Sequence, residues 1–194
     1  MHSSYLTNNF AEVFKAMISA YQPIVCVEIG VLEGYSAIAI AQGLKENFDK
    51  HGAQGHLSAY DLFDEYPYRH VSQETTKKNI DEAGLSDWVT LYEEDARNVD
   101  GFYQSNSVHF LHIDISNTGT TVRQMMEKWD KKMVQGGIIC FEGGSEERDQ
   151  VEWMVQNKCE SIKLQLEINP IIEARYIFGT YFKFPSLTCL LKKR

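Results

Sequence analysis

Short apolar runs alternate with segments of helical periodicity over most of this chain. The run at 24–29, Ile-Val-Cys-Val-Glu-Ile, is β-branched and almost wholly apolar, which is typical of a strand buried on both faces of a parallel sheet. Within 8–20, Phe10, Phe14 and Ile18 recur with helical spacing, so a helix is predicted there. The same two signals predict further strands at 56–60, 88–92, 108–113 and 138–141, and further helices at 36–48, 74–83, 122–133 and 147–157.

This alternation predicts an α/β fold. Strands that alternate with helices form parallel sheets through right-handed crossovers, so we expect a doubly wound, Rossmann-like, mostly parallel sheet. After residue 157 the pattern changes: residues 162–168 and 187–192 both predict strands, with no helix predicted between them, which favours a C-terminal antiparallel strand or hairpin. No repeat or low-complexity linker interrupts the chain, so one domain is expected. It comprises an N-terminal helical part (1–22), a core (24–142) and a C-terminal part (143–194).

Composition and charge narrow the possible partners. The formal net charge is −8, and the densest basic run is the C-terminal 192–194, so neither nucleic acid nor an anionic membrane surface is expected as a partner. No stretch reaches the roughly 18 apolar residues of a transmembrane helix, and residues 1–9 lack the pattern of a signal peptide. The 4 cysteines form no CxxC pair, and Cys26, Cys140 and Cys189 lie in predicted strands. Buried, reduced thiols and a cytoplasmic location are therefore expected.

A turn with two glycines joins the first predicted strand to the next helix. Gly30 and Gly34 permit positive φ angles and a close approach of a ligand to the backbone, and the free N–H groups of a helix start favour an anionic group such as a carboxylate. The dinucleotide fingerprint G-x-G-x-x-G needs a middle glycine to make room for pyrophosphate, and this chain has Leu32 there. The turn therefore favours a ligand other than a nicotinamide dinucleotide; a plain strand-to-helix turn is the alternative.

Acidic residues stand at or just past the ends of four predicted strands, in order Asp61, Asp95, Asp114 and Glu142. The carboxyl ends of parallel strands meet at one edge of a sheet, where α/β proteins bind their ligands. A carboxylate at the end of the second strand, Asp61, is suited to accept both hydroxyls of a ribose. For any single acid, a helix cap or a solvated loop position is the alternative.

These residues carry a resemblance to a known family. The segment from Glu28 to Ala41, Glu-Ile-Gly-Val-Leu-Glu-Gly-Tyr-Ser-Ala-Ile-Ala-Ile-Ala, resembles the first motif of class I S-adenosylmethionine-dependent methyltransferases. It is similar above all to the small O-methyltransferases related to the catechol and caffeoyl-CoA enzymes and to methyltransferase family 24. The resemblance implies that 24–142 is a cofactor-binding core. It implies contacts with the methionine end for Glu28, Gly30, Gly34, Tyr35 and Ser36, with the ribose for Asp61, and with the adenine for Asp95 and Ala96.

The catalytic residues are less well defined by the resemblance. His112 and Asp114 match the family's fourth motif, near the transferred methyl group, although His112 could equally be a packed core residue. Metal-dependent catechol-type relatives have a lysine three residues after this aspartate and an Asp-Asn pair after strand five, whereas this chain has Asn117 and Glu142-Gly143. Asp114 and Glu142 could still hold Mg²⁺, with water completing the shell. The alternative for Glu142 is an N-terminal cap of the following helix. Arg148 could contact an acidic or sugar acceptor, and the alternative for it is a solvated position at a helix start.

The expected function is methyl transfer from S-adenosylmethionine to a small hydroxylated molecule, such as a sugar or a secondary metabolite. Two alternatives remain open, a nonenzymatic module that only binds the methyl donor and an NAD-dependent oxidoreductase. Aromatic residues at 63, 66 and 68 and between 176 and 184 are candidates to cover the ligands. Aromatic stripes also form core and dimer contacts, and a homodimer is a further expectation.

Overall fold

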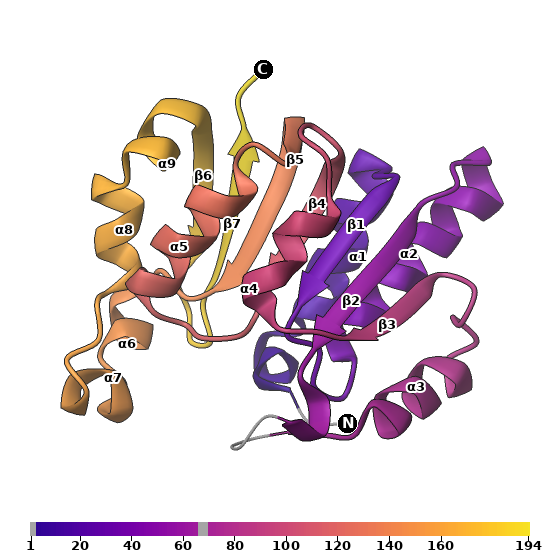
Figure 1. Cartoon of the computed structure of the whole chain (residues 1–194), viewed down its shortest axis with the longest axis horizontal. Coiled ribbons are helices and arrows are strands. Elements are labelled where there is room, and N and C mark those ends of the chain that lie inside the picture. The colour runs from indigo at the N-terminus through magenta and orange to yellow at the C-terminus, as the bar shows by residue number, and fades with distance from the viewer. Residues whose placement is uncertain (1–2, 66–69) are drawn as a thin grey trace. The chain divides into compact units, whose positions relative to one another are not determined.

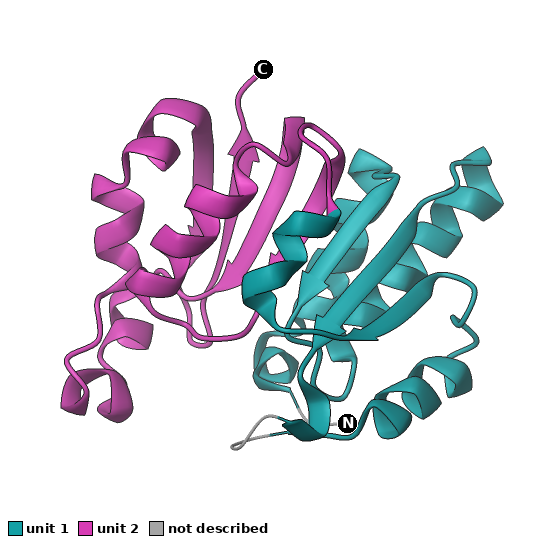
Figure 2. Cartoon of the chain, in the orientation of Figure 1, with its two compact units in different colours: residues 1–102 teal, residues 103–194 magenta. Residues whose placement is uncertain are grey.

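The computed structural model describes residues 3–65 and 70–194, and the chain divides into two compact units, residues 1–102 and 103–194 (Figure 2). The described residues contain seven strands, the first six of which alternate with helices along the chain, and the predicted α/β class is confirmed (Figure 1). The expectation of a single domain stays a prediction. Within the described residues, no helix combines the length and apolar character that crossing a membrane requires.

The described residues of unit 1 contain three parallel strands, in the order β3-β2-β1. The predicted strands and helices of this unit are confirmed to within a few residues. The elements are η1 (Ser4–Asn8), α1 (Phe10–Tyr21), β1 (Val25–Ile29), α2 (Tyr35–His51), β2 (His56–Asp61), η2 (Phe63–Glu65), α3 (Gln73–Glu82), β3 (Val89–Glu93), α4 (Ala96–Val99) and η3 (Asp100–Phe102).

The apolar face of α1 is buried against α2. Phe10, Phe14 and Ile18 are each at most 2% exposed, as their helical spacing predicts. A Cβ added at Gly43 of α2 would lie 2.7 Å from the Cβ of Ile18, so the glycine permits a close approach of the two helices. Asn47 donates to the Ile18 carbonyl at 2.8 Å, which satisfies a polar group in this contact.

Unit 2 contains four strands, in the order β4-β5-β7-β6. β4 and β5 are parallel, whereas β7 is antiparallel to both β5 and β6, so the predicted C-terminal hairpin is confirmed. Helices α5, α8 and α9 lie together on one side of these strands (Figure 1). The elements are β4 (Val108–Ile113), α5 (Gly119–Trp129), β5 (Met133–Glu142), α6 (Glu146–Asp149), α7 (Glu152–Gln156), α8 (Ile162–Ile168), α9 (Pro170–Arg175), β6 (Tyr176–Tyr181) and β7 (Leu187–Lys192).

Three predictions fail in unit 2. Residues 162–168 form α8 and not a strand, because Ser161 caps the helix and Asp149 accepts hydrogen bonds from the backbone N–H groups of residues 162 and 163. The helix predicted at 147–157 is two short helices, α6 and α7, since Val151 has an extended backbone. A helix, α9, does separate α8 from the C-terminal strands, with Asn169 as its cap and Pro170 in its first turn.

Candidate functional site

The turn between β1 and α2 has the backbone that its glycines predict. Gly30 and Gly34 both have φ of +88°, a conformation that favours glycine. The N–H of Gly30 donates to the Tyr60 carbonyl of β2 at 2.8 Å, and the N–H of Gly34 donates to the Val31 carbonyl at 2.9 Å. Residues 30–34, called the glycine loop below, therefore leave the end of β1 in a fixed course and open α2.

Asp61, the last residue of β2, holds the glycine loop in place. Its Oδ2 accepts hydrogen bonds from the backbone N–H groups of Val31 at 2.7 Å and Leu32 at 3.0 Å. Its Oδ1 accepts one from the N–H of Phe63 at 2.9 Å. The predicted neighbourhood of Asp61 and the two glycines is thus present within unit 1, whereas the ribose contact of Asp61 stays a prediction.

Side chains of helix α3 also hold the glycine loop, a contact that the sequence did not reveal. The hydroxyl of Thr76, which is fully buried, donates to the Leu32 carbonyl, and Asn79 donates to the Glu33 carbonyl at 2.9 Å. A Cβ added at Gly34 would lie 3.3 Å from the Cγ2 of Thr76. Polar residues three apart on one face of a helix were the only sequence signal for this brace.

The other residues predicted for the methionine end flank the same loop. Glu28 in β1 is fully buried, and Ser36 in the first turn of α2 is 5% exposed. Tyr35, the first residue of α2, accepts a long hydrogen bond of 3.4 Å from the backbone N–H of Ala11 through its hydroxyl. A glutamate is rarely fully buried unless it is paired, so the burial of Glu28 is a notable feature of this strand end.

The two residues predicted for the adenine lie at the start of α4. Asp95 caps this helix by accepting from the N–H of Arg97 at 2.8 Å, and Ala96 is its first residue. Asp95 also pairs with the Arg97 guanidinium, a hydrogen bond that raises the pKa of Arg97. The helix-cap alternative is therefore correct for Asp95, and its contact with adenine stays a prediction.

Aromatic rings stack at the end of β2. The Tyr60 and Tyr92 rings are 5.0 Å apart and almost parallel, at 17°. Phe102 stacks against Tyr60 at 6.2 Å. Phe63, one of the predicted covering residues, is 1% exposed and belongs to the core, while residues 66 and 68 lie outside the described residues.

In unit 2, the predicted catalytic residues lie at the end of β4. His112 is fully buried within the strand, which is the packed-core alternative, and Asp114 follows the strand and is half-buried. Ile113 and Phe141 are register partners, so Asp114 and Glu142 leave neighbouring strands at the same edge. A recess of about 10 Å³, enough for about one water molecule, lies here. It is lined mostly by apolar residues, together with Ser116, Asn117, Thr121 and Glu142.

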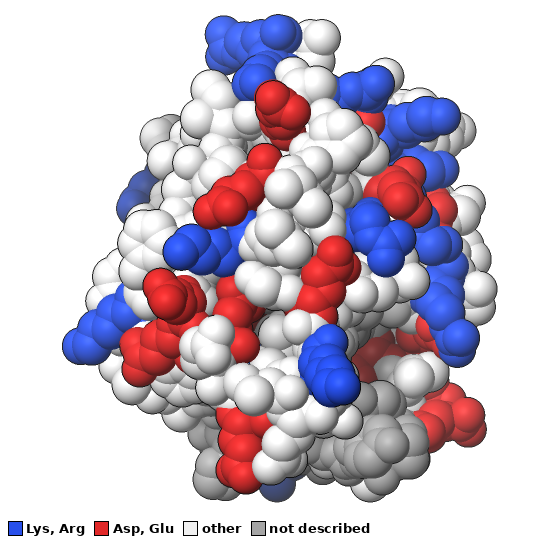
Figure 3. All heavy atoms as spheres, turned by 90° about the vertical axis from the view of Figure 1, so that its left-hand side faces the viewer, with Lys and Arg blue, Asp and Glu red and all other residues white. Residues whose placement is uncertain are grey.

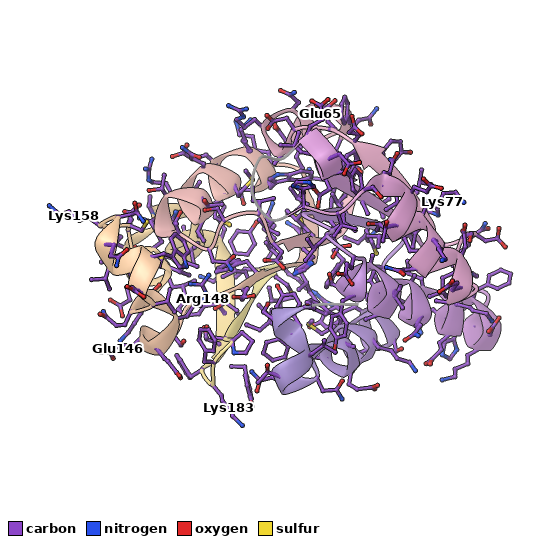
Figure 4. The ribbon with its side chains drawn as sticks, turned by 90° about the horizontal axis from the view of Figure 1, so that it is seen from below. Glu65, Lys77, Glu146, Arg148, Lys158 and Lys183 are labelled. Atoms are coloured by element: carbon purple, nitrogen blue, oxygen red, sulfur yellow. The ribbon has the colours of Figure 1, made fainter. Side chains whose placement is uncertain are left out.

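Glu142 does not cap a helix, because Ser145 is the residue that caps α6. Its Oε1 accepts a hydrogen bond from Arg148 Nε at 3.0 Å, and both side chains are 7% exposed. The sequence suggested a solvated position for Arg148 at a helix start, and this alternative is wrong because the side chain is buried. In Figure 4, Arg148 points inward, whereas Glu146 of the same helix points away from the body of the unit.

The acidic residues do not form a metal site of the usual kind. Among residues 3–65 and 70–194, no three His, Cys, Asp or Glu side chains are grouped so that they could hold an ion. Mg²⁺ is usually bound by one or two carboxylates together with water, and the Glu142 carboxylate already has the Arg148 guanidinium as its partner. The donor set at this edge therefore does not fit Mg²⁺.

Comparison with known proteins gives a family match and several structural matches. A family profile described as a methyltransferase domain, family 24, matches residues 27–142. No curated protein matches the sequence. The solved structures that resemble the chain have low sequence identity, so their likeness shows the fold alone.

Three of those structures are compared with this chain by their sequence identity, coverage and TM-score. Cofactor-bound Rv0187 from MTB is 17% identical with a TM-score of 0.70, and the match covers 96% of this chain and 80% of that one. An O-methyltransferase from Bacillus cereus in complex with SAH is 17% identical with a TM-score of 0.66, covering 95% and 81%. A Clostridium thermocellum protein described as a candidate rRNA methylase is 17% identical with a TM-score of 0.65, covering 99% of both chains. These matches confirm the predicted doubly wound, Rossmann-like α/β fold.

Proposed function

The chain belongs to methyltransferase family 24, which confirms its resemblance to class I S-adenosylmethionine-dependent methyltransferases, and from this premise we propose that it methylates a hydroxyl group of a small molecule. The observation that carries the proposal is the glycine loop, with its two residues at positive φ, its hydrogen bonds to Asp61 and its brace from α3. A loop fixed in this way before ligand binding loses little conformational entropy when a ligand binds.

Asp61 has hydrogen-bonding capacity left for one ribose hydroxyl, and not for the two hydroxyls that its position in the sequence suggested. A carboxylate offers about four lone-pair positions, and the three backbone N–H groups occupy all but one of them. The remaining position is proposed to accept a hydrogen bond from a ribose hydroxyl while the glycine loop stays in place. Glu28, Gly30, Gly34, Tyr35 and Ser36 are proposed to line the methionine end. Asp95 and Ala96 are proposed to border the adenine.

When bound, S-adenosylmethionine supplies a methyl group on a positively charged sulfur, and this group is transferred in a single displacement. Transfer of this methyl group to a hydroxyl oxygen would release the hydroxyl proton, which a residue of this chain would have to accept. Asp114, half-buried at the end of β4, is proposed to accept this proton. His112 is proposed to support the site from within β4, since its full burial keeps it from solvent.

The acceptor is proposed to be a small, uncharged, hydroxylated molecule, such as a sugar or a secondary metabolite. The residues beside Glu142 support an uncharged acceptor, because they are mostly apolar with a few polar side chains among them. The net charge of −8 does not favour nucleic acid. Acidic and basic side chains are interspersed on the face shown in Figure 3, which does not favour a polyanion there either.

The cytoplasm is the proposed compartment, and a homodimer is the proposed assembly. Cys26 and Cys140 are fully buried with reduced thiols, which supports a reducing environment. Strand β6 ends the strand order of unit 2 and carries three exposed large apolar residues, Ile177, Phe178 and Tyr181. Such a surface is typical of a protein contact. Analytical ultracentrifugation over a range of concentrations would test the dimer.

Isothermal titration with S-adenosylhomocysteine tests the proposed function. We expect saturable binding by the wild type, weakened about tenfold or more in Asp61→Asn, because hydrogen bonds to a charged group contribute about 1.5–3 kcal/mol. Asp87→Asn is the matched control, since Asp87 is an exposed acid of the same unit, and it should bind as the wild type does. Absence of binding by the wild type, with binding of NADH instead, would favour the oxidoreductase.

A further inference from the structure

Glu142 and Arg148 form a buried ion pair at the carboxyl end of β5. The hydrogen bond from Nε to Oε1 is 3.0 Å long, and each side chain is 7% exposed. Two such charges are stable away from water only when each compensates the other. The carboxylate of Glu142 therefore has a built-in cationic partner that comes from its own unit.

The backbone between the two residues is shaped to bring them together. Gly143 and Gly144 have φ of +121° and +96°, where other residues are strained. A Cβ at Gly143 would lie 2.4 Å from Ile162 Cδ1, and one at Gly144 would lie 2.3 Å from Thr188 Oγ1, so larger residues do not fit. This tight double turn returns the chain so that Arg148, the third residue of the short helix α6, reaches back to Glu142.

Arg148 is held on two sides but keeps a donor without a partner. Its guanidinium carbon lies 5.5 Å from the centroid of the Trp153 ring, a cation–π contact. Its Nη1 is buried and has no hydrogen-bond partner among the described residues. Buried donors of a purely structural arginine are nearly always satisfied. The unused donor indicates that Arg148 contributes to a ligand-binding site at the carboxyl end of β5 and is not only part of the core.

A divalent metal does not suit this arrangement. Two positive groups that share one carboxylate in a buried site repel each other, and burial strengthens that repulsion. Glu142 also lines the recess, together with Asn117, whose side chain is neutral. The positive charge at this edge is thus supplied by a side chain and not by an ion.

We propose that Arg148 takes the place of a divalent cation beside Glu142, so that this protein works without a metal, and that Arg148 is the positioning residue that holds the Glu142 side chain at the recess. This inference rests on the proposed function. The Glu142–Arg148 pair has no net charge, and this also favours an uncharged acceptor. A carboxylate or phosphate buried beside the pair would add a negative charge that nothing compensates.

Binding of Mn²⁺, followed through the electron paramagnetic resonance signal of the free ion, tests the proposal without an acceptor. We expect the wild type and Glu142→Gln to bind Mn²⁺ equally weakly, since Glu142 contributes no ligand. In Arg148→Gln the freed carboxylate should bind Mn²⁺ about tenfold or more tightly than in the wild type, which corresponds to the loss of one nearby positive charge. Arg148→Lys keeps the charge and should behave as the wild type does.

Two outcomes would overturn the proposal. One is Mn²⁺ binding by the wild type that Glu142→Gln abolishes, and this comparison needs no arginine variant to fold. The other is a folded Arg148→Gln protein, checked by circular dichroism, that gains no binding. Titration of each variant with S-adenosylhomocysteine separates this inference from the proposed function, because donor binding depends on unit 1 residues and should be the same in all of them.

Discussion

At the scale of single residues, Gly34 offers a direct test of the glycine loop. Its φ of +88° and the 3.3 Å approach of Thr76 Cγ2 to an added Cβ predict that Gly34→Ala lowers the free energy of unfolding by about 1 kcal/mol or more. Affinity for S-adenosylhomocysteine should fall as well. Urea denaturation and isothermal titration measure the two effects.

Gly101→Ala is the matched control for this substitution. Gly101 lies in the same unit, has no positive φ, and an added Cβ would meet nothing within 4 Å. Its replacement should leave both stability and binding close to the wild-type values. Equal unfolding free energies for the two variants would mean that the conformation of Gly34 contributes nothing to the loop.

Cys189 is predicted to be the more reactive thiol of a cross-strand pair. Cys140 and Cys189 are register partners on β5 and β7, with sulfurs 3.4 Å apart. The S–H of Cys140 donates to Cys189 and lowers the pKa of Cys189, whereas burial raises the pKa of Cys140. Since the thiolate is the nucleophile, iodoacetamide near neutral pH should modify Cys189 before Cys140.

Peptide mapping by mass spectrometry at several times measures this order. Cys140→Ala removes the donor, so the pKa of Cys189 should rise and its alkylation should slow. If Cys189 reacts as fast in that variant as in the wild type, the S–H contact has no influence on its reactivity.

From the sequence, the neighbourhood of the glycine loop and Asp61 could be predicted, whereas the burial of single charged residues could not. The glycines and Asp61 could be identified because a strand end followed by a glycine turn leaves a clear pattern. The roles of Glu142 and Arg148 were misjudged, because a sequence of charged residues looks solvated and nothing in it reveals burial. Gly143 and Gly144, which follow Glu142, pack against Ile162 and Thr188, and these two residues are distant in the sequence and close in the fold.

At the scale of elements, α3 is predicted to hold the glycine loop through its side chains. Asn79→Ala removes the hydrogen bond to the Glu33 carbonyl and should lower the free energy of unfolding by about 1 kcal/mol. The affinity for S-adenosylhomocysteine should fall with it, because the loop is less well fixed. Denaturation in urea and isothermal titration again provide the measurements.

Lys78→Ala is the control for this helix, since Lys78 is the neighbouring residue and is exposed. It tests whether a change in helix composition alone has an effect, and only a small change is expected. The brace would be refuted if Asn79→Ala bound S-adenosylhomocysteine as tightly as Lys78→Ala.

Helix α8 shows why some elements could not be predicted. Its sequence, Ile-Lys-Leu-Gln-Leu-Glu-Ile, alternates apolar and polar residues with a period of two, which is the pattern of a half-buried strand. The deciding interactions come from its ends, where Ser161 and Asp149 satisfy the first N–H groups and Asn169 begins the next helix. Asp149 is 13 residues from Ile162, so its contribution is invisible to a local pattern.

At the scale of the whole molecule, the alternation of strands and helices predicted the α/β class because it is repeated along the chain. Each parallel strand in the described residues was located by an apolar run, and errors of a few residues at its ends did not alter the class. The C-terminal hairpin was predicted as well, although β6 lacks such a run and was not located. A prediction of fold class rests on many strands and helices, so an error in one of them does not change it. A single contact between distant segments leaves no repeated pattern in the sequence and cannot be predicted in this way.

The burial of thiols in the core gives a prediction for the stability of the whole molecule against pH. Cys26 in β1 is fully buried, and this burial raises its pKa well above the ordinary value of 9.0. Below pH 9 the thiol is protonated in both the folded and the unfolded chain, so it adds no pH dependence. Above it, the unfolded chain loses this proton and the folded chain retains it, so the free energy of unfolding should fall by up to about 1.4 kcal/mol per pH unit.

Urea denaturation in the presence of a reductant, at pH values on both sides of the ordinary thiol pKa, measures this slope. Cys26→Ala should have a shallower slope than the wild type, because one proton fewer is released on unfolding. Val27→Ala is the control: it removes buried volume from the same strand and should lower stability equally at every pH. A Cys26→Ala slope as steep as that of Val27→Ala would show that the alkaline loss of stability comes from other groups, while a shallower one would assign it to the buried thiol of β1.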